Sequence, residues 1–180
     1  MHEDLERILF TREQIHLGIN EVAAQISRDY RGRQLMLVGV LKGAVFFLTH
    51  LAEALEMPVE IDFLGIASFS PGRPLPGVVR ISKDLDLDIL DKDVLVVEDI
   101  VNTGLTLRYL LNILSGRQPS SLAVCAFLDK YTRRLVDIPV KYRCFEVPDR
   151  FVVGFGLDYN QHYRALPYVG ILKSHIYQGK

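Results

Sequence analysis

The chain has 180 residues, of which 49% are hydrophobic and 24% are charged, and its 21 basic and 22 acidic side chains give a formal net charge of −1. This length and composition are typical of one globular domain over residues 1–180, and the balanced charge shows no basic footprint for nucleic acid. No apolar run approaches the roughly 20 residues of a membrane span, and the first ten residues have no apolar signal core. We therefore expect a cytoplasmic enzyme or binding protein with no membrane or nucleic-acid partner. Cys125 and Cys144 lack CxxC spacing, so we expect two reduced structural thiols.

Strand and helix patterns alternate through most of the chain. The first helix follows a capping box made by Thr11 and Gln14, after which apolar residues recur at helical spacing. Continuously apolar runs predict buried strands, and Pro and Gly clusters predict loops. In chain order we expect a helix over 12–26, a strand over 34–41, a helix over 44–55, a strand over 59–68, a loop over 70–77, strands over 78–85 and 93–97, a helix over 106–115, and short strands over 122–129, 140–147, 151–157 and 168–173.

These patterns predict the fold class. Strands that are apolar without interruption and that alternate with helices are typical of a mainly parallel sheet with both faces covered. The expected class is therefore α/β, with a mainly parallel central sheet flanked by helices.

The segment VLVVEDIVNTGLTL, residues 94–107, carries the strongest chemical signal. In an open parallel sheet, ligands bind beyond the carboxyl ends of the strands, and Glu98 and Asp99 lie at such an end. The turn over 102–106 offers backbone N–H groups, two hydroxyls and a glycine just before a helix, which suits a phosphate group. The two carboxylates can accept hydrogen bonds from the vicinal hydroxyls of a ribose, so a sugar phosphate is the predicted ligand. The alternative is that both acids are solvated turn residues and that Asn102 or Thr103 merely caps the helix.

An apolar strand, Glu-Asp, two residues and then x-Thr-Gly-x-Thr resemble the phosphoribosyl-pyrophosphate (PRPP) motif of the type I phosphoribosyltransferases. The resemblance covers nearly the whole chain and is to the hypoxanthine-guanine branch, through LVGVLKGAVFF at 37–47, LDK at 128–130 and VPDRFVVGFGLDYNQHYRALP at 147–167. It implies the type I phosphoribosyltransferase fold, with a small hood built from the terminal segments. It also implies purine salvage, in which the 5-phosphoribosyl group of PRPP passes to N9 of hypoxanthine or guanine and gives IMP or GMP and pyrophosphate.

The resemblance also assigns roles around the sugar phosphate. Glu98 and Asp99 match the pair that holds the ribose hydroxyls, and Lys42-Gly43 matches a turn, often with a non-proline cis peptide, whose backbone contacts pyrophosphate. Arg164 matches the arginine that binds pyrophosphate, for which a forked guanidinium is well suited. Taken alone, Lys42 would be an ordinary surface lysine. The turn that matches the 5′-phosphate site consists of Asn102, Thr103, Gly104, Leu105 and Thr106.

Four further residues match the family's purine and metal positions. Lys130 matches the lysine that donates to the 6-oxygen, and since an ammonium group only donates, it favours an oxo group over the amino group of adenine. Phe151 matches the aromatic residue that stacks on the purine, although core packing would be the first reading of its surroundings, and Val152 supplies backbone groups to the base edge. Asp158 matches the acid that meets Mg²⁺ and, through water, the base. Mg²⁺ is the implied cofactor, with Asp158, Glu98 and Asp99 as its candidate ligands.

Two features depart from the family pattern. The loop expected to match the mobile lid, residues 68–80, has Ser68-Phe69 in place of the usual Ser-Tyr and is unusually rich in proline. Asn102 replaces the usual aspartate that is the proposed acceptor for the N7 proton of the purine. An amide oxygen can accept a hydrogen bond from N7–H but cannot take up its proton at physiological pH.

Three accounts of Asn102 remain open: a natural variant with weak activity, a protein that binds without catalysis, and an engineered substitution that traps substrates. The second is a rival function, a regulator of the phosphoribosyltransferase fold that binds nucleotide or RNA. The near-zero net charge and the complete set Lys130, Phe151, Asp158 and Arg164 favour the enzyme instead. The resemblance further implies a homodimer or homotetramer.

Overall fold

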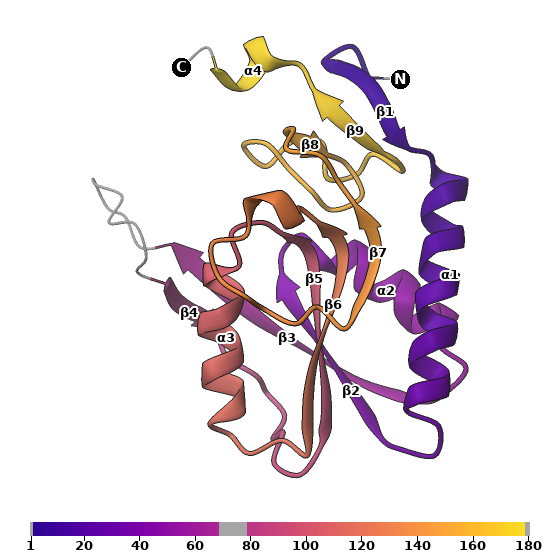
Figure 1. Cartoon of the computed structure of the whole chain (residues 1–180), viewed down its shortest axis with the longest axis vertical. Helices are drawn as coiled ribbons and strands as arrows, with labels where there is room; N and C mark the ends of the chain where they lie inside the picture. Colours follow the sequence, from indigo (N-terminus) through magenta and orange to yellow (C-terminus); the bar gives the residue numbers. More distant parts are fainter. Residues whose placement is uncertain (1, 69–78, 179–180) are drawn as a thin grey trace.

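The computed structural model describes residues 2–68 and 79–178, and their strands form two sheets (Figure 1). The larger sheet has the strand order β4-β3-β2-β5-β6-β7, with β4 antiparallel to β3 and the other neighbours parallel. The smaller sheet is antiparallel, in the order β1-β9-β8. The elements are β1 (Leu5–Phe10), α1 (Arg12–Asp29), β2 (Leu35–Leu41), α2 (Ala44–Ala54), β3 (Val59–Ser68), β4 (Val79–Lys83), β5 (Asp93–Val101), α3 (Leu105–Ser115), β6 (Ser121–Asp129), the 3-10 turn η1 (Tyr131–Arg133), β7 (Tyr142–Glu146), β8 (Val152–Val153), β9 (Val169–Leu172) and α4 (Ser174–Gln178).

Helix α1 begins at the predicted capping box. The Thr11 hydroxyl accepts from the Gln14 N–H at 3.3 Å, and the Gln14 side chain accepts from the Thr11 N–H at 2.9 Å. This reciprocal pair satisfies two N–H groups that a helix start would otherwise leave without partners. The apolar stripe that the sequence predicts is buried; it consists of Ile15, Ile19, Val22, Ala23 and Ile26.

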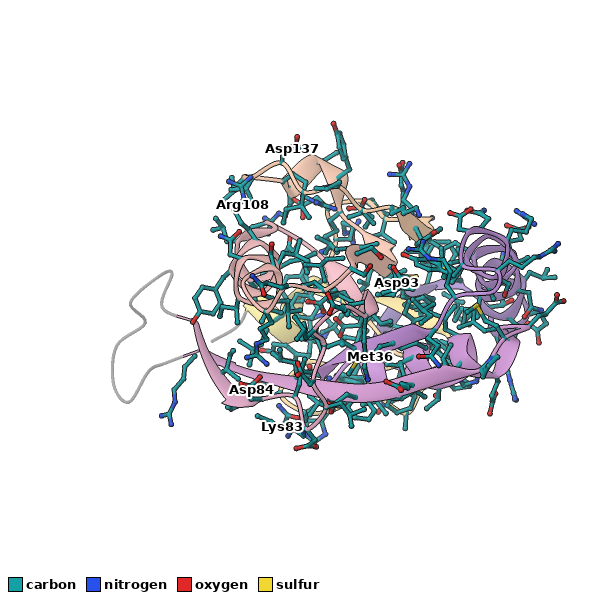
Figure 2. The ribbon with its side chains drawn as sticks, turned by 90° about the horizontal axis from the view of Figure 1, so that it is seen from below. Met36, Lys83, Asp84, Asp93, Arg108 and Asp137 are labelled. Atoms are coloured by element: carbon teal, nitrogen blue, oxygen red, sulfur yellow. The ribbon has the colours of Figure 1, made fainter. Side chains whose placement is uncertain are left out.

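Helices cover both faces of the larger sheet, which confirms the expected α/β class. Side chains of successive strand residues point to opposite faces. Leu35 and Leu37 of β2 therefore lie in the apolar cluster with α1 and α2, whereas Met36, which Figure 2 labels, and Val38 lie in the cluster with α3. Burial on both faces explains why β2, β5 and β6 are continuously apolar in sequence.

The smaller sheet forms the hood and is built from the two ends of the chain, as expected. Strand β1 pairs with β9, and α4 follows β9 (Figure 1). The sequence patterns did not predict β1. They were also wrong about 151–157, where only Val152–Val153 is a strand, because Gly154, Phe155 and Gly156 all have positive φ and turn the chain.

The hood lies above the edge of the larger sheet at which its parallel strands end (Figure 1). This arrangement places loops from both sheets around one edge, where ligands bind in parallel α/β folds. None of the helices within residues 2–68 and 79–178 is long and apolar enough to cross a bilayer.

Candidate active site

Three neighbouring strands bring the predicted site residues to the same edge. Strand β5 lies between β2 and β6. In the parallel register Glu98 is opposite Ala126, and Val101 is opposite Asp129. The turn after β2, the acidic pair near the end of β5 and the end of β6 therefore lie side by side.

Asp99 lies directly against Gly43. A Cβ atom built on Gly43 would stand 1.6 Å from Asp99 Oδ2, so any side chain there would displace the carboxylate. The other carboxylate oxygen of Asp99, Oδ1, is fixed by the Ile100 N–H, which donates to it at 2.7 Å. Gly43 is the N-cap residue directly before α2, and the Leu41–Lys42 peptide before it is cis, as the resemblance implies. Lys42 itself is exposed.

Glu98 is buried and Asp99 is half-buried, and burial dominates the electrostatics of the pair. Glu98 has only 8% of its surface exposed, and burial raises its pKa well above the usual range, with the neighbouring Asp99 charge adding to the effect. Burial likewise raises the pKa of Asp99 to about 6, against the opposing effects of the Ile100 N–H and Arg164. Hydrogen-bond donors or cations brought by a ligand would therefore stabilise the charged forms of these two adjacent carboxyl groups.

The predicted phosphate turn borders a cavity of about 340 Å³. Gly104 has φ +83 and directly precedes α3, a conformation that favours glycine, and a Cβ there would lie 2.9 Å from Ile138. Asn102 is exposed at the start of this turn. The cavity joins the turn to one member of the acidic pair, because its polar lining is made by Glu98, Asn102, Thr103, Gly104 and Thr106.

On the next strand, Lys130 follows β6 and is only 7% exposed. Its backbone N–H donates to the Val101 carbonyl at 2.9 Å, and its ammonium donates to the Arg150 carbonyl at 2.6 Å. Burial lowers the pKa of Lys130, although the nearby Asp149 charge opposes this effect. The ammonium is thus held beside the segment that carries Phe151 and the buried Val152, so the structure brings these three candidate residues together.

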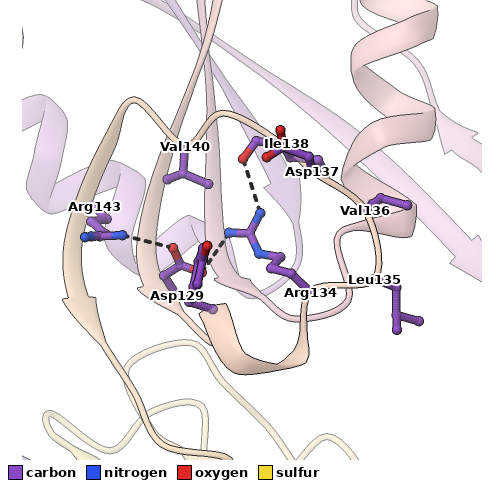
Figure 3. A pocket seen from close by; sticks show the side chains of 9 residues that line it. Asp129, Arg134, Leu135, Val136, Asp137, Ile138, Val140 and Arg143 are labelled. Atoms are coloured by element: carbon purple, nitrogen blue, oxygen red, sulfur yellow. Dashed lines mark hydrogen bonds and ion pairs between the residues drawn. The ribbon is translucent and has the colours of Figure 1, made fainter.

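The residue before Lys130 forms an ion pair that the sequence did not predict. Asp129 is 1% exposed and accepts from Arg134 at 2.7 Å, while Arg143 lies 3.6 Å away on its other side (Figure 3). The same segment reaches the phosphate turn, because the Leu135 N–H donates to the Thr103 carbonyl at 3.0 Å. Arg108 of α3, which lies near Asp137 in Figure 2, adds a further link by donating to the Asp137 carbonyl at 2.8 Å. Residues 129–138 therefore connect Lys130 with the phosphate turn.

The loop after β8 places Asp158 beside Arg164. Their side chains form an ion pair at 2.8 Å, and Arg164 also donates to the Gly156 carbonyl at 2.7 Å. A Cβ on Gly156 would overlap the Gly43 carbonyl oxygen, so this loop packs closely on the turn after β2. The two closely spaced glycines of the GFG sequence are the sequence signal for this close packing, although the apolar residues around them predict a strand.

The carboxylates expected to meet Mg²⁺ come from two elements, strand β5 and the loop after β8. Within the described residues, no three acidic, histidine or cysteine side chains gather closely enough to hold a metal by themselves. Asp158 nevertheless lies near enough to Asp99 to raise its pKa. Of the predicted lid, Ser68 ends β3, whereas Phe69 and the rest of the loop through residue 78 lie outside the described residues.

Comparison with known proteins agrees with this geometry. The family model of the phosphoribosyl transferase domain matches residues 8–160. A hypoxanthine-guanine phosphoribosyltransferase of Streptococcus agalactiae is 44% identical over 177 residues, which cover 98% of this chain and 98% of that protein. The protein of the same name in Staphylococcus aureus is also 44% identical, over 98% of this chain and 99% of its own length.

Solved structures give the same result. A crystal structure of a hypoxanthine phosphoribosyltransferase from Staphylococcus aureus has a TM-score of 0.93 at 44% identity, covering 98% of this chain and 96% of that one. A structure described as the asparagine mutant in an analysis of an invariant aspartic acid in HPRTs has a TM-score of 0.94 at 39% identity, covering 99% and 98% of the two chains.

Proposed function

The chain belongs to the phosphoribosyl transferase domain family, and from that premise we propose that it is a purine-salvage enzyme. It transfers the 5-phosphoribosyl group of PRPP to N9 of hypoxanthine or guanine, which gives IMP or GMP and pyrophosphate. The relatives at 42–44% identity bear the name of this activity. The observation that carries the proposal is the adjacent pair of the buried Glu98 and the half-buried Asp99, which lies beside a glycine-containing turn and one strand away from Lys130.

The acidic pair and the turn hold the ribose phosphate. Glu98 and Asp99 accept hydrogen bonds from the two ribose hydroxyls, and these bonds offset the cost of holding two adjacent, partly desolvated carboxylates. The 5′-phosphate lies at the amino end of α3, where free N–H groups and the helix dipole favour an anion. Thr103 and Thr106 border the same cavity and add hydroxyl donors.

Lys130, Phe151 and Val152 bind the base. The Lys130 ammonium, already oriented by the Arg150 carbonyl, donates to the 6-oxygen of hypoxanthine or guanine. Adenine offers an amino group at that position, and two donors cannot form a hydrogen bond. Phe151 stacks on the purine, and Val152, fixed by pairing with Ile171, presents its backbone groups to the base edge.

Pyrophosphate leaves toward Lys42, Gly43 and Arg164. The guanidinium of Arg164 is held by Asp158 and the Gly156 carbonyl, with a fork suited to phosphate oxygens. Three carboxylates near this edge fit a hard cation that takes oxygen ligands and keeps several waters, so Asp158, Glu98 and Asp99 are the residues that would hold Mg²⁺ directly or through water. When bound, Mg²⁺ would neutralise negative charge on pyrophosphate.

Electrostatic stabilisation provides most of the catalysis. As the bond from the anomeric carbon to pyrophosphate breaks, positive charge develops on the ribose ring beside Glu98 and Asp99, and negative charge grows near Arg164 and the Lys42 turn. Residues 68–80 act as a lid that excludes water, which would otherwise hydrolyse PRPP.

Asn102 sets the rate of the chemical step. Its oxygen accepts a hydrogen bond from N7–H of the purine but cannot take the proton, so substrates bind and turnover is slow. A relative described as an asparagine mutant at an invariant aspartic acid has a TM-score of 0.94, so such an exchange is compatible with this fold. Asn102 is also the observation that favours the second candidate function, a regulator that binds nucleotide or RNA with little turnover.

The remaining features follow the family. Residues 1–180 form one transferase domain, the molecule assembles as a homodimer or homotetramer, and it acts in the cytoplasm without a nucleic-acid or membrane partner. The decisive experiment mixes the protein with PRPP, Mg²⁺ and hypoxanthine, guanine, xanthine or adenine in turn and follows nucleotide formation. Product with hypoxanthine or guanine supports the enzyme; binding of nucleotide with no product from any base supports the regulator.

A further inference from the structure

Tyr177 of α4 stacks on Phe151, and neither the sequence patterns nor the family resemblance assigns it a role. The two ring centroids are 4.9 Å apart with planes inclined by 27°, so the rings lie nearly face to face. Tyr159 meets the edge of the same Phe151 ring, with centroids 5.5 Å apart and planes at 88°. Phe151 is thus held by two aromatic contacts and remains only half-buried.

Tyr177 approaches Phe151 from the hood. Val152 points into the main core with α1 and α2, whereas its neighbours Phe151 and Val153 belong to the separate hood cluster, which also contains Tyr177. Helix α4 lies at the top of the molecule beside β9, on the side of the hood away from the larger sheet (Figure 1). The face of Phe151 that Tyr177 covers is therefore the one turned toward the hood.

Backbone hydrogen bonds attach the segment that leads into α4 to the rest of the hood. The Leu172 N–H donates to the Phe151 carbonyl at 2.8 Å, and the Lys173 N–H donates to the Asp4 carbonyl at 3.0 Å. These bonds attach the chain just before α4 to the residue that precedes β8 and to the amino-terminal segment. The carbonyl of the preceding residue, Arg150, accepts from the Lys130 ammonium at 2.6 Å.

We propose that Tyr177 is a positioning residue for the purine: it packs on the hood side of Phe151, fixes the plane of that ring and leaves its other face to the base. The inference rests on the proposed function, because it takes Phe151 as the residue that stacks on the purine. A phenylalanine without this backing can rotate, and ordering it would then reduce the affinity for the base. The effect is confined to the purine, since Tyr177 is remote in sequence and contact from the acidic pair.

The test compares the KM for hypoxanthine with the KM for PRPP in five variants. Tyr177→Ala removes the ring and Tyr177→Leu keeps an apolar side chain without an aromatic face, so either one serves if the other unfolds. Tyr177→Phe preserves the stack, and His175→Ala changes an exposed residue of the same helix. Phe151→Ala tests the assumption on which the inference depends. Thermal unfolding of each variant shows whether it is folded.

We expect Tyr177→Ala and Tyr177→Leu to raise the KM for hypoxanthine by about threefold to tenfold, with kcat and the KM for PRPP changed less than about twofold. Tyr177→Phe and His175→Ala should match the parent. An unchanged or lowered KM for hypoxanthine in Tyr177→Ala, when Phe151→Ala raises it, overturns the inference alone and indicates that Tyr177 covers the face that the base needs. An unchanged KM in Phe151→Ala refutes the assigned role of Phe151, and the inference with it.

Discussion

Gly43 and Asp99 touch across the ends of β2 and β5, so closely that a Cβ on Gly43 would lie 1.6 Å from Asp99 Oδ2. The contact joins two motifs that are 56 positions apart in the chain (99 − 43) and that have separate roles in the proposed reaction, one at pyrophosphate and one at ribose. A glycine at residue 43 is therefore needed for the geometry of the acidic pair.

Gly43→Ala should impair PRPP binding. The methyl group must push away the Asp99 carboxylate, which then cannot accept from a ribose hydroxyl, and we expect the KM for PRPP to rise at least about tenfold, as for the loss of a charged hydrogen bond. Steady-state kinetics at saturating hypoxanthine measures this. Gly116→Ala is the matched control, since a Cβ there has 3.4 Å of clearance and an ordinary helical φ of −63. Equal PRPP kinetics in the two variants would contradict the proposed contact.

Much of this architecture could be predicted from sequence, because it depends on local patterns. The capping box at Thr11 places the start of α1, and the alternation over 59–68 predicts β3 with the observed bounds. The unpredicted strand β1 forms only by pairing with β9, which is distant in sequence, so no local pattern identifies it. Segment 151–157 was misread because its apolar residues suggest a strand, whereas its glycines turn the backbone.

The same difference between local patterns and long-range contacts applies to the candidate site. The acidic pair and its turn could be found from one segment, since a strand end, carboxylates and a glycine before a helix are contiguous. The contacts that orient the site residues, from Gly43 to Asp99, from Arg134 to Asp129 and from Tyr177 to Phe151, could not. The first and third join segments that are distant in sequence and that strand order or side-chain packing brings together, whereas the second forms because the 3-10 turn after β6 brings Arg134 back to Asp129.

Asp99→Asn should stabilise the ligand-free protein at alkaline pH. Burial raises the pKa of Asp99 from the ordinary 3.8 to about 6, so the stability that this carboxyl contributes is present below pH 3.8 and is lost as the pH rises through about 6. At pH 8 the folded protein holds a charge that an amide removes, and we expect the free energy of unfolding to increase by about 1 kcal/mol or more.

Urea unfolding at pH 8 and pH 5 measures this difference. The gain should be larger at pH 8 than at pH 5, because part of the folded population is already protonated at pH 5. Glu53→Gln, which changes an exposed carboxylate on α2, should have little effect at either pH. If Asp99→Asn is less stable than the parent at pH 8, the Asp99 charge is already compensated in the folded protein and the prediction is wrong.

Asn102→Asp should accelerate turnover. A carboxylate can take up the N7 proton, and general-base contributions are typically about a hundredfold or more, so we expect kcat to rise at least about tenfold. The KM for each substrate should change little, since the amide already accepts the hydrogen bond. Asn112→Asp, an exposed change on α3, is the control for added charge. Unchanged turnover would show that residue 102 is not the proton acceptor.

Arg134→Met should destabilise the fold far more than Arg133→Met. Arg134 is 11% exposed and pairs with Asp129, which is buried, so its loss leaves a buried carboxylate facing only the more distant Arg143. Breaking such a pair costs about 3–5 kcal/mol. Arg133 and Asp149 are both 51% exposed, and a surface pair contributes about 0–1 kcal/mol. Denaturant unfolding compares the two, and equal losses would refute a structural role for the Asp129 pair.

Binding of PRPP to the acidic pair is most directly tested by calorimetry. Titration of PRPP with Mg²⁺ into the unaltered protein should give saturable binding, and Glu98→Gln combined with Asp99→Asn should weaken it by at least about a hundredfold, because two charge-assisted hydrogen bonds are lost. Equal affinity in the two proteins, or no binding to the unaltered one, would contradict the proposed ribose site and the transferase function built on it.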